Sequence, residues 1–174
     1  MSTRIVIDGY NVIRQSGQLI DLEAIALEEG RLGLIQLLAA YKKLKGHAIT
    51  VVFDGWQSDN IGSSREKIQG IDIIYSGRGE KADEIIKRMV DHMGDKVVVV
   101  TSDREIVKHA EKRGAVVIPS PEFEIKVRMS ASGDDDIYFM EEEDHEPRIG
   151  TKKKGPARKL SKVERKKKSQ MEKL

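Results

Sequence analysis

The sequence contains no cysteine among its 174 residues. Disulfide bonds and zinc sites built on thiolates are therefore excluded, and the composition is compatible with a reducing compartment. No apolar stretch approaches the roughly 20 residues that a membrane helix requires, and the chain shows no internal repeat. Hydrophobic residues make up 39% of the chain, which suffices for one ordinary core. We therefore expect a soluble, cytoplasmic protein with a single folded domain.

Charge is distributed unevenly along the chain. Residues 1–133 carry 19 basic and 19 acidic side chains, whereas residues 134–147 carry eight acidic side chains and no lysine or arginine. Residues 148–174 carry 12 basic side chains against two acidic ones. Segments with so little apolar content and so much charge of one sign do not fold alone. We predict a folded domain over residues 1–130, an acidic linker over 131–147 and a disordered basic tail over 148–174.

Within the folded part, apolar runs with strand character alternate with segments of helical spacing. Glycines follow the helical segments, as at Gly46, Gly94 and Gly114, and mark their ends. Alternation of this kind predicts an α/β fold with a parallel, right-handed, doubly wound sheet. We expect strands at residues 5–7, 48–53, 71–75, 96–100 and 115–118, and helices at 32–46, 82–93, 104–113 and 121–129.

Three of the apolar runs end on an aspartate, namely Asp8, Asp54 and Asp103. In a parallel sheet the carboxyl ends of the strands lie along one edge, so these carboxylates converge where open α/β folds bind ligands. Ionised carboxylates cannot crowd together without a counter-charge, and the usual solutions are a shared proton or a bound divalent cation. The pattern therefore indicates metal-assisted phosphate chemistry.

Each of these aspartates also has a purely structural interpretation. Asp8 and Asp54 each precede a glycine, as in a turn. Asp103 can interact favourably with the dipole of a helix that Ser102 caps in a capping box. It can do so and also be a ligand of the site. A site is favoured by Asn11, because it places a second oxygen donor three residues after Asp8 for a cation or a phosphate-bound water. Ser102 can also contact substrate, since a helix amino terminus presents free N–H groups to phosphate.

A glycine-rich basic loop, residues 77–81, leads into the helix predicted at 82–93. Its Arg78 and Lys81 can hold a phosphate while Asp83, in the first helical turn, faces the other carboxylates. This is the division of labour that metal-dependent cleavage of a phosphodiester requires. The structural alternative is that Asp83 only compensates the helix dipole.

Residues 55–70 are long for a connection in an α/β fold, and such length is usually functional or disordered. We interpret the segment as a mobile flap over the substrate that contains Arg65 and Lys67. Trp56 and Tyr10 each lie close to a strand-end aspartate and can stack on a base, if the substrate is a single-stranded nucleic acid. Plain packing is the alternative for both rings.

Four short motifs occur in order along the chain: Ile-Asp-Gly-Tyr-Asn at residues 7–11, Val-Phe-Asp-Gly at 52–55, Lys-Ala-Asp-Glu-Ile-Ile at 81–86 and Thr-Ser-Asp-Arg-Glu at 101–105. In motif order and spacing, residues 1–129 resemble the YacP-like NYN domains, which are relatives of the PIN nucleases. The resemblance implies a three-layer, PIN-like α/β fold with a mainly parallel central sheet. It also implies an endoribonuclease that depends on Mg²⁺ or Mn²⁺.

The resemblance further implies roles for individual residues. By position in the motifs, Asp8, Asp83 and Asp103 would bind the metal. Asn11 would position water or phosphate, and Asp54 would be a further acid of the site.

Two basic clusters in the tail contain no aromatic residue that could read a base. They should therefore bind RNA phosphates without sequence preference, through release of counterions. The segment can also fold on a structured RNA such as that of a ribosome, while a merely solubilising tail is the alternative. The clusters are Lys152, Lys153 and Lys154, followed by Arg165, Lys166, Lys167 and Lys168.

The favoured function is cleavage of mRNA or ribosome-associated RNA, and two functions of other classes stay open. A non-catalytic RNA- or ribosome-binding adaptor would use the tail and treat the aspartates as caps. An aspartate-based phosphatase also places aspartates at strand ends, but the position two residues after its nucleophile, where the commonest pattern has a second acid, is here Tyr10. Histidine catalysis has little support, because the four histidines are scattered: His47, His92, His109 and His145.

Overall fold

The structure is a computed structural model that describes residues 3–55, 62–132 and 162–173. It is an α/β fold with one six-stranded sheet. The strands are β1 (Arg4–Asp8), β2 (Ala48–Phe53), β3 (Ser64–Ile68), β4 (Ile71–Tyr75), β5 (Val97–Val100) and β6 (Val116–Ile118). The helices are α1 (Gly9–Arg14), α2 (Gly17–Ile25), α3 (Leu27–Lys45), α4 (Ala82–Met93), the short 3₁₀ helix η1 (Gly94–Lys96), α5 (Arg104–Lys112), α6 (Ser120–Ser132) and α7 (Lys162–Lys173).

The sheet has the strand order β3-β4-β2-β1-β5-β6, and every neighbouring pair is parallel except β3 with β4. This confirms the predicted mainly parallel sheet. The register places Asp8 opposite Val52 on β2, and Ile7 opposite Val100 on β5. The carboxyl ends of the three central strands therefore lie side by side, as the sequence argument required.

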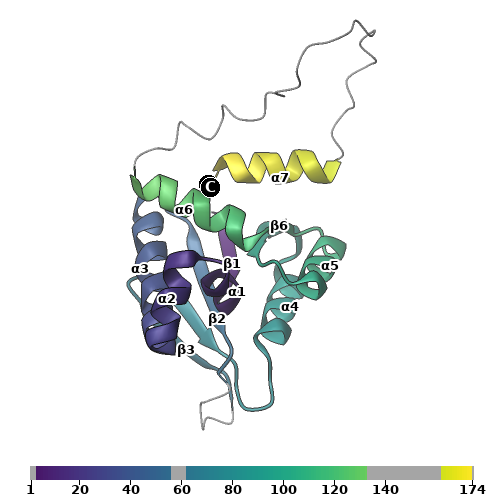
Figure 1. The fold of residues 1–174 in the computed structure, drawn as a ribbon. Coiled ribbons are helices and arrows are strands. Elements are labelled where there is room, and N and C mark those ends of the chain that lie inside the picture. The colour runs from purple at the N-terminus through teal and green to yellow at the C-terminus, as the bar shows by residue number, and fades with distance from the viewer. Residues whose placement is uncertain (1–2, 56–61, 133–161, 174) are drawn as a thin grey trace, which may run out of the picture.

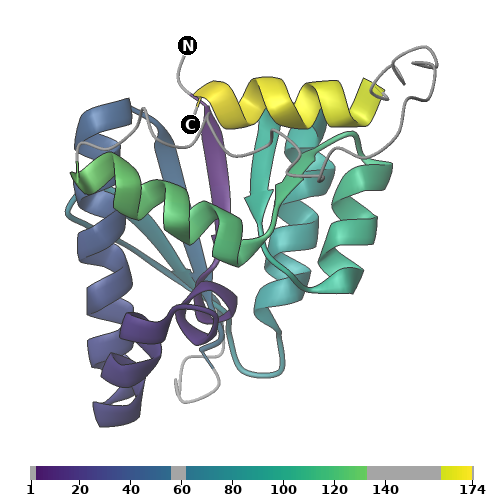
Figure 2. The ribbon, with the colours of Figure 1, turned by 45° about the horizontal axis from the view of Figure 1, so that its top comes forward.

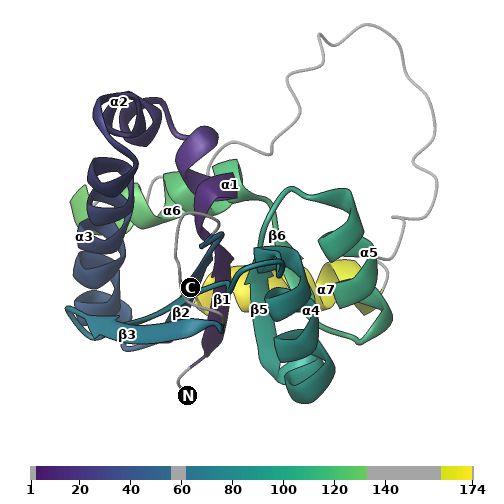
Figure 3. The same ribbon diagram turned by 90° about the horizontal axis from the view of Figure 1, so that it is seen from below.

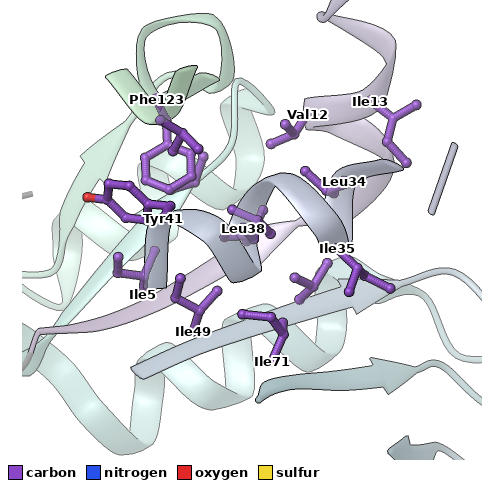
Figure 4. Close-up of a cluster of buried hydrophobic side chains, with 14 of the residues drawn as sticks. Ile5, Val12, Ile13, Leu34, Ile35, Leu38, Tyr41, Ile49, Ile71 and Phe123 are labelled. Carbon is purple, nitrogen blue, oxygen red and sulfur yellow. The ribbon is translucent and has the colours of Figure 1, made fainter. Parts of the chain in front are cut away.

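Helices cover both faces of the sheet and create three layers (Figures 1 and 3). Successive strand residues point to opposite faces, so Ile5 and Ile7 join one core with α1, α2, α3 and α6, while Val6 joins a second core with α4 and α5. Figure 4 shows the first core, where the ring of Phe123 on α6 meets that of Tyr41 on α3 edge to face, 5.9 Å between centroids. Both cores hold the strand ends in fixed relative positions.

The segment expected to be a mobile flap contains a regular hairpin instead. Residues Ser64–Ile68 form β3, which pairs with β4 through a tight turn at Gln69 and Gly70. Both turn residues have positive φ, 50° and 82°, as hairpin turns of this hand require. Arg65 and Lys67 consequently lie on an exposed edge strand, and Lys67 pairs with Asp72 at 3.0 Å. The flap interpretation is wrong for these two residues, and Trp56 lies outside the described residues.

Part of the tail is also ordered, contrary to expectation. Residues Lys162–Lys173 form α7, which contacts β6 and packs Met171 against the first core. Lys166 Nζ donates to the carbonyl oxygen of Gly114 at 2.6 Å, and Lys167 Nζ pairs with Glu122 at 3.0 Å. The prediction of disorder is therefore wrong for this helix, because apolar packing and polar contacts offset its ordering entropy. The other basic cluster, Lys152–Lys154, lies outside the described residues.

Figure 2 shows α7 crossing the sheet at the end where β1 begins, opposite the end where α1 and α4 begin. The basic helix is thus remote from the strand ends that carry the aspartates. None of the helices in the described part of the chain is long and apolar enough to cross a membrane.

Docking of α7 should depend on Met171. A fully buried methionine contributes roughly 1.5–3 kcal/mol, and this one is partly buried, so Met171→Ser should weaken docking by about 1–2 kcal/mol. Amide hydrogen exchange over residues 162–173 should accelerate accordingly. The matched control is Lys168→Ser, on the exposed face of the same helix. Equal exchange in both variants would show that α7 does not depend on this contact.

Candidate active site

Four aspartates act on one another at the carboxyl edge of the sheet. The negative charges of Asp83 and Asp54 both raise the pKa of Asp8, and those of Asp103 and Asp54 raise the pKa of Asp83. Asp8 is the last residue of β1, Asp54 and Asp103 follow β2 and β5, and Asp83 lies in the first turn of α4. The structure thus brings together all the acids that the sequence singled out.

Asp8 is the most strongly perturbed of these acids. Burial raises its pKa from 3.8 to about 6, and the charges of Asp83 and Asp54 add to the rise. Hydrogen bonds act in the opposite direction: the hydroxyl of Thr101 donates to Oδ2 at 3.1 Å, and the backbone N–H of Asn11 donates to Oδ1 at 3.4 Å. Asp8 is therefore a carboxylate held in an unfavourable field, which a bound cation would relieve.

Asp103, and not Ser102, is the N-cap of α5. Its Oδ1 accepts from the backbone N–H groups of Glu105 at 2.8 Å and Ile106 at 3.1 Å. Its own N–H donates to Thr101 Oγ1 at 3.1 Å, so Thr101 links two of the acids. The predicted capping box is placed one residue too early, because the helix begins only at Arg104.

Ser102 and Asn11 link three segments at the sheet edge through hydrogen bonds. Asn11 Oδ1 accepts from the N–H of Ser102 at 2.9 Å, the hydroxyl of Ser120 at 2.7 Å and the amide of Gln15 at 3.0 Å. Ser102 Oγ in turn accepts from Ser120 N–H and donates to Gln15. The oxygen expected to serve a cation is thus occupied by three donors, which tie α1, the β5–α5 connection and the start of α6 together.

Asp54 positions the helix that carries Asp83. Its Oδ1 accepts from the N–H of Ala82 at 2.7 Å, where α4 begins, and from the hydroxyl of Ser76 at 3.5 Å. Burial raises the pKa of Asp83, the charge of Asp103 adds to the rise, and Lys87 opposes it. Within the described residues the Asp83 carboxylate makes no hydrogen bond or ion pair, which leaves it available to a ligand.

The two predicted phosphate contacts of the 77–81 loop lie on the surface. Arg78 and Lys81 are both exposed, beside the amino terminus of α4. Neither side chain has an ion-pair or hydrogen-bond partner in the part of the chain that the structure describes. Their charges are therefore available to an anionic substrate near Asp83.

Arg31, a residue of α3 that no sequence motif singled out, interacts with Tyr10. Arg31 Nε donates to the Tyr10 hydroxyl at 2.7 Å, and Nη2 donates to the same oxygen. The Tyr10 ring is 6% exposed and lies against Phe53, so packing is its role, and the structure does not support base stacking. Arg31 lies three positions before Leu34 and four before Ile35, so it shares their helical face. A charged residue on this apolar face was the signal available in the sequence.

The donor set suits a hard cation. Among the described residues, no group of three or more acids or histidines stands close enough to hold a metal ion by itself. The acids nonetheless supply only oxygen donors, and Mg²⁺ typically keeps several waters and uses one or two carboxylates. Asp8, Asp83 and Asp103 could hold such an ion. Its binding would lower the repulsion between Asp83 and Asp8 and between Asp83 and Asp103.

The raised pKa of Asp8 predicts a specific dependence of stability on pH. Between pH 3.8 and about 6 the folded protein binds more protons at Asp8 than the unfolded chain does, so the free energy of unfolding falls as pH rises through this window. A shift of this size corresponds to at most about 3 kcal/mol. Asp8→Asn removes the titration, so the variant's stability relative to wild type should grow by about 2–3 kcal/mol between pH 4 and pH 8.

Urea unfolding of the metal-free protein, in EDTA, measures this difference. Asp21→Asn, at an exposed position of α2, is the matched control and should show no such change with pH. A stability difference between Asp8→Asn and wild type that is the same at both pH values would contradict the raised pKa of Asp8.

Comparisons with known proteins agree with the motif resemblance. The family model of the YacP-like NYN domain matches residues 5–173, so the match continues beyond residue 129 through α7. The uncharacterized protein YacP of Bacillus subtilis (strain 168) is 32% identical over 102 residues, which are 57% of this chain and 59% of that protein. The chain thus spans less than two thirds of the curated relative that it matches.

Solved structures show the same fold. The crystal structure of Rae1 (YacP) from Bacillus subtilis is 28% identical, with a TM-score of 0.62 over 76% of each chain. A tryptophan-to-leucine mutant of that protein matches with a TM-score of 0.63 and 28% identity, over 75% of this chain and 77% of that one. Because the family model covers nearly the whole sequence and the solved relatives share the fold, this chain belongs to the YacP-like NYN domain family, within the PIN-like nuclease superfamily.

Proposed function

We propose that this protein is a metal-dependent endoribonuclease that cleaves phosphodiester bonds of mRNA or ribosome-associated RNA, with Mg²⁺ or Mn²⁺ as cofactor. The observation that carries the proposal is a group of neighbouring carboxylates at the sheet edge, in which burial and the charges of the neighbouring acids raise the pKa of Asp8 and of Asp83. Two exposed basic side chains, Arg78 and Lys81, lie beside this group and have no partner within the described residues. Such an arrangement suits an anionic substrate bound through a metal. Membership of the NYN family supports the same activity.

In this proposal the side chains have distinct roles. Asp8, Asp83 and Asp103 hold the cation, and Thr101 orients two of them through its hydroxyl. When bound, the cation would lower the pKa of a water molecule and stabilise the charge that develops on the phosphoryl oxygens. Asp54 acts by fixing the start of α4.

The remaining groups of the site bind and orient the RNA. Arg78 and Lys81 hold the phosphate next to Asp83, where in-line attack by water would leave 5′-phosphate and 3′-hydroxyl ends. Ser102 Oγ and its N–H are both engaged within the protein, so Ser102 contributes to RNA binding by keeping the β5–α5 connection in place. Arg65 and Lys67 contribute positive charge from the edge strand β3.

The first test concerns the metal-binding acids. Asp8→Asn, Asp83→Asn and Asp103→Asn should each reduce RNA cleavage in Mg²⁺ or Mn²⁺ by at least about 100-fold, since each removes a charge that the reaction requires. Asparagine is as good an N-cap as aspartate, so the Asp103 variant keeps α5 and isolates the loss of charge. Asp21→Asn is the control for a lost surface carboxylate. Cleavage that survives in any of the three variants would remove that residue from the site.

A non-catalytic RNA- or ribosome-binding adaptor is the second candidate. It is favoured by one observation: Asp54 and Asp103 already accept backbone N–H groups at the amino termini of α4 and α5. Chelation separates the two functions, because an adaptor would bind RNA equally well in EDTA and never cleave it. The phosphatase alternative loses support, since Tyr10 occupies the position of its second acid and is packed against Arg31.

The outer face of α7 gives a second test. Arg165 and Lys168 are exposed there and are proposed to contact RNA phosphates, whereas Lys166 and Lys167 are engaged with the domain. Replacing both Arg165 and Lys168 by glutamine should lower the log–log salt slope of single-stranded RNA binding by about 1.4, roughly 0.7 for each lost contact. The control variant replaces two other exposed lysines, Lys43 and Lys112, by glutamine. An unchanged slope after the α7 substitutions would leave this helix a structural element.

A further inference from the structure

The guanidinium of Arg31 lies among three aromatic rings. Its central carbon is 5.4 Å from the ring centroid of Tyr10, 5.6 Å from that of Phe53 and 5.2 Å from that of Tyr75. Arg31 also donates two hydrogen bonds to the Tyr10 hydroxyl. Cation–π contacts and these bonds hold the planar group in one orientation, so little conformational entropy remains for a ligand to remove.

The charge of Arg31 is not compensated by a carboxylate. Within the described residues it forms no ion pair, although its side chain is partly buried. A second guanidinium, that of Arg14, lies 5.2 Å from the Tyr10 ring, and its own partner is Glu23 at 3.5 Å. A second carboxylate, that of Glu66, reaches this cluster through Tyr75, but within the described residues neither it nor Glu23 forms an ion pair with Arg31. A partly buried cation without an ion-pair partner is costly to fold, and this cost is reduced when an anion binds.

The neighbouring phenols do not supply the missing negative charge. Burial raises the pKa of Tyr75 to about 12, and the hydrogen bond with Glu66 acts in the same direction. Burial likewise raises the pKa of Tyr10. Both rings are consequently neutral at physiological pH, and the positive charge around Arg31 persists.

The rings come from residues that directly adjoin the acids. Tyr10 follows Asp8 by two positions, and Phe53 immediately precedes Asp54. Tyr75 is paired with Phe53 across β2 and β4, and its successor Ser76 bonds to Asp54. The arginine site therefore adjoins the carboxylates from the side of α3, whereas the 77–81 loop approaches them from the side of α4; Figure 3 shows these two helices on opposite sides of the sheet.

We propose that Arg31, assisted by Arg14, forms a binding subsite for a backbone phosphate of single-stranded RNA next to the bond to be cleaved. This inference rests on the proposed nuclease function and adds to it the path of the RNA across the site. The RNA would run from the 77–81 loop, across the carboxylates, to Arg31. Arginine suits such a position because its fork binds two phosphate oxygens at once, and Nη1 makes no hydrogen bond within the described residues.

Arg31→Met tests the subsite, since methionine keeps an unbranched apolar stem against the rings and loses only the charged fork. Binding of a short single-stranded RNA is measured in EDTA, so that cleavage plays no part. Affinity should fall by about 10-fold, and the log–log salt slope should fall by about 0.7. Arg31→Lys, which retains the charge, should recover most of the slope. Arg113→Met is the matched control, an exposed arginine of the opposite face that pairs with Asp91.

Thermal unfolding of each variant shows whether the ring cluster survives. If Arg31→Met does not fold, Arg14→Gln provides the same test at an exposed position and should likewise lower the salt slope. An unchanged affinity and slope in every folded variant at these two arginines would overturn the subsite, even if the wild type cleaves RNA. Conversely, a weakened Arg31→Met in a protein that never cleaves RNA would support the subsite and refute the nuclease.

Discussion

Burial of neighbouring carboxylates is the constraint on which this edge of the sheet depends. Three parallel strands and one helix bring Asp8, Asp54, Asp83 and Asp103 within range of one another. Burial raises the pKa of Asp8, and the charges of Asp83 and Asp54 add to the rise. A sheet with two packed cores can hold such a group because the strand ends cannot move apart. A cation bound at this edge would offset part of the cost of burying these carboxylates.

Hydrogen bonds that hold the helices in place also aim the acids. Asp54 receives the first N–H of α4, and Asp103 receives two N–H groups of α5. Thr101, between them in the sheet edge, donates to Asp8 and accepts from Asp103. Structural and functional interpretations of these aspartates are therefore not exclusive, because one oxygen of a carboxylate can cap a helix while the other faces a ligand.

Positive charge surrounds this edge from different sides. Arg78 and Lys81 are exposed at the surface beside α4, whereas Arg31 is held by aromatic rings on the α3 side. The basic helix α7 lies at the far end of the sheet (Figure 2), so its exposed cations would contact RNA well away from the carboxylates. Such a distribution favours a long or structured substrate that can contact several surfaces at once.

The sequence alone determined the elements whose signals are local, since β2 and α4 have the predicted bounds. The motifs also predicted that Asp8, Asp54, Asp83 and Asp103 lie near one another at one edge of the sheet. Features that depend on distant contacts needed the tertiary structure. The β3 hairpin has a polar, exposed edge strand without an apolar pattern, α7 is stabilised by Met171 in a distant core, and Asn11 accepts donors up to 109 residues away. In the sequence, Arg31 looks like an ordinary helical arginine, because propensity and periodicity describe only neighbours along the chain. Only the tertiary structure shows that three separate segments place aromatic rings around it.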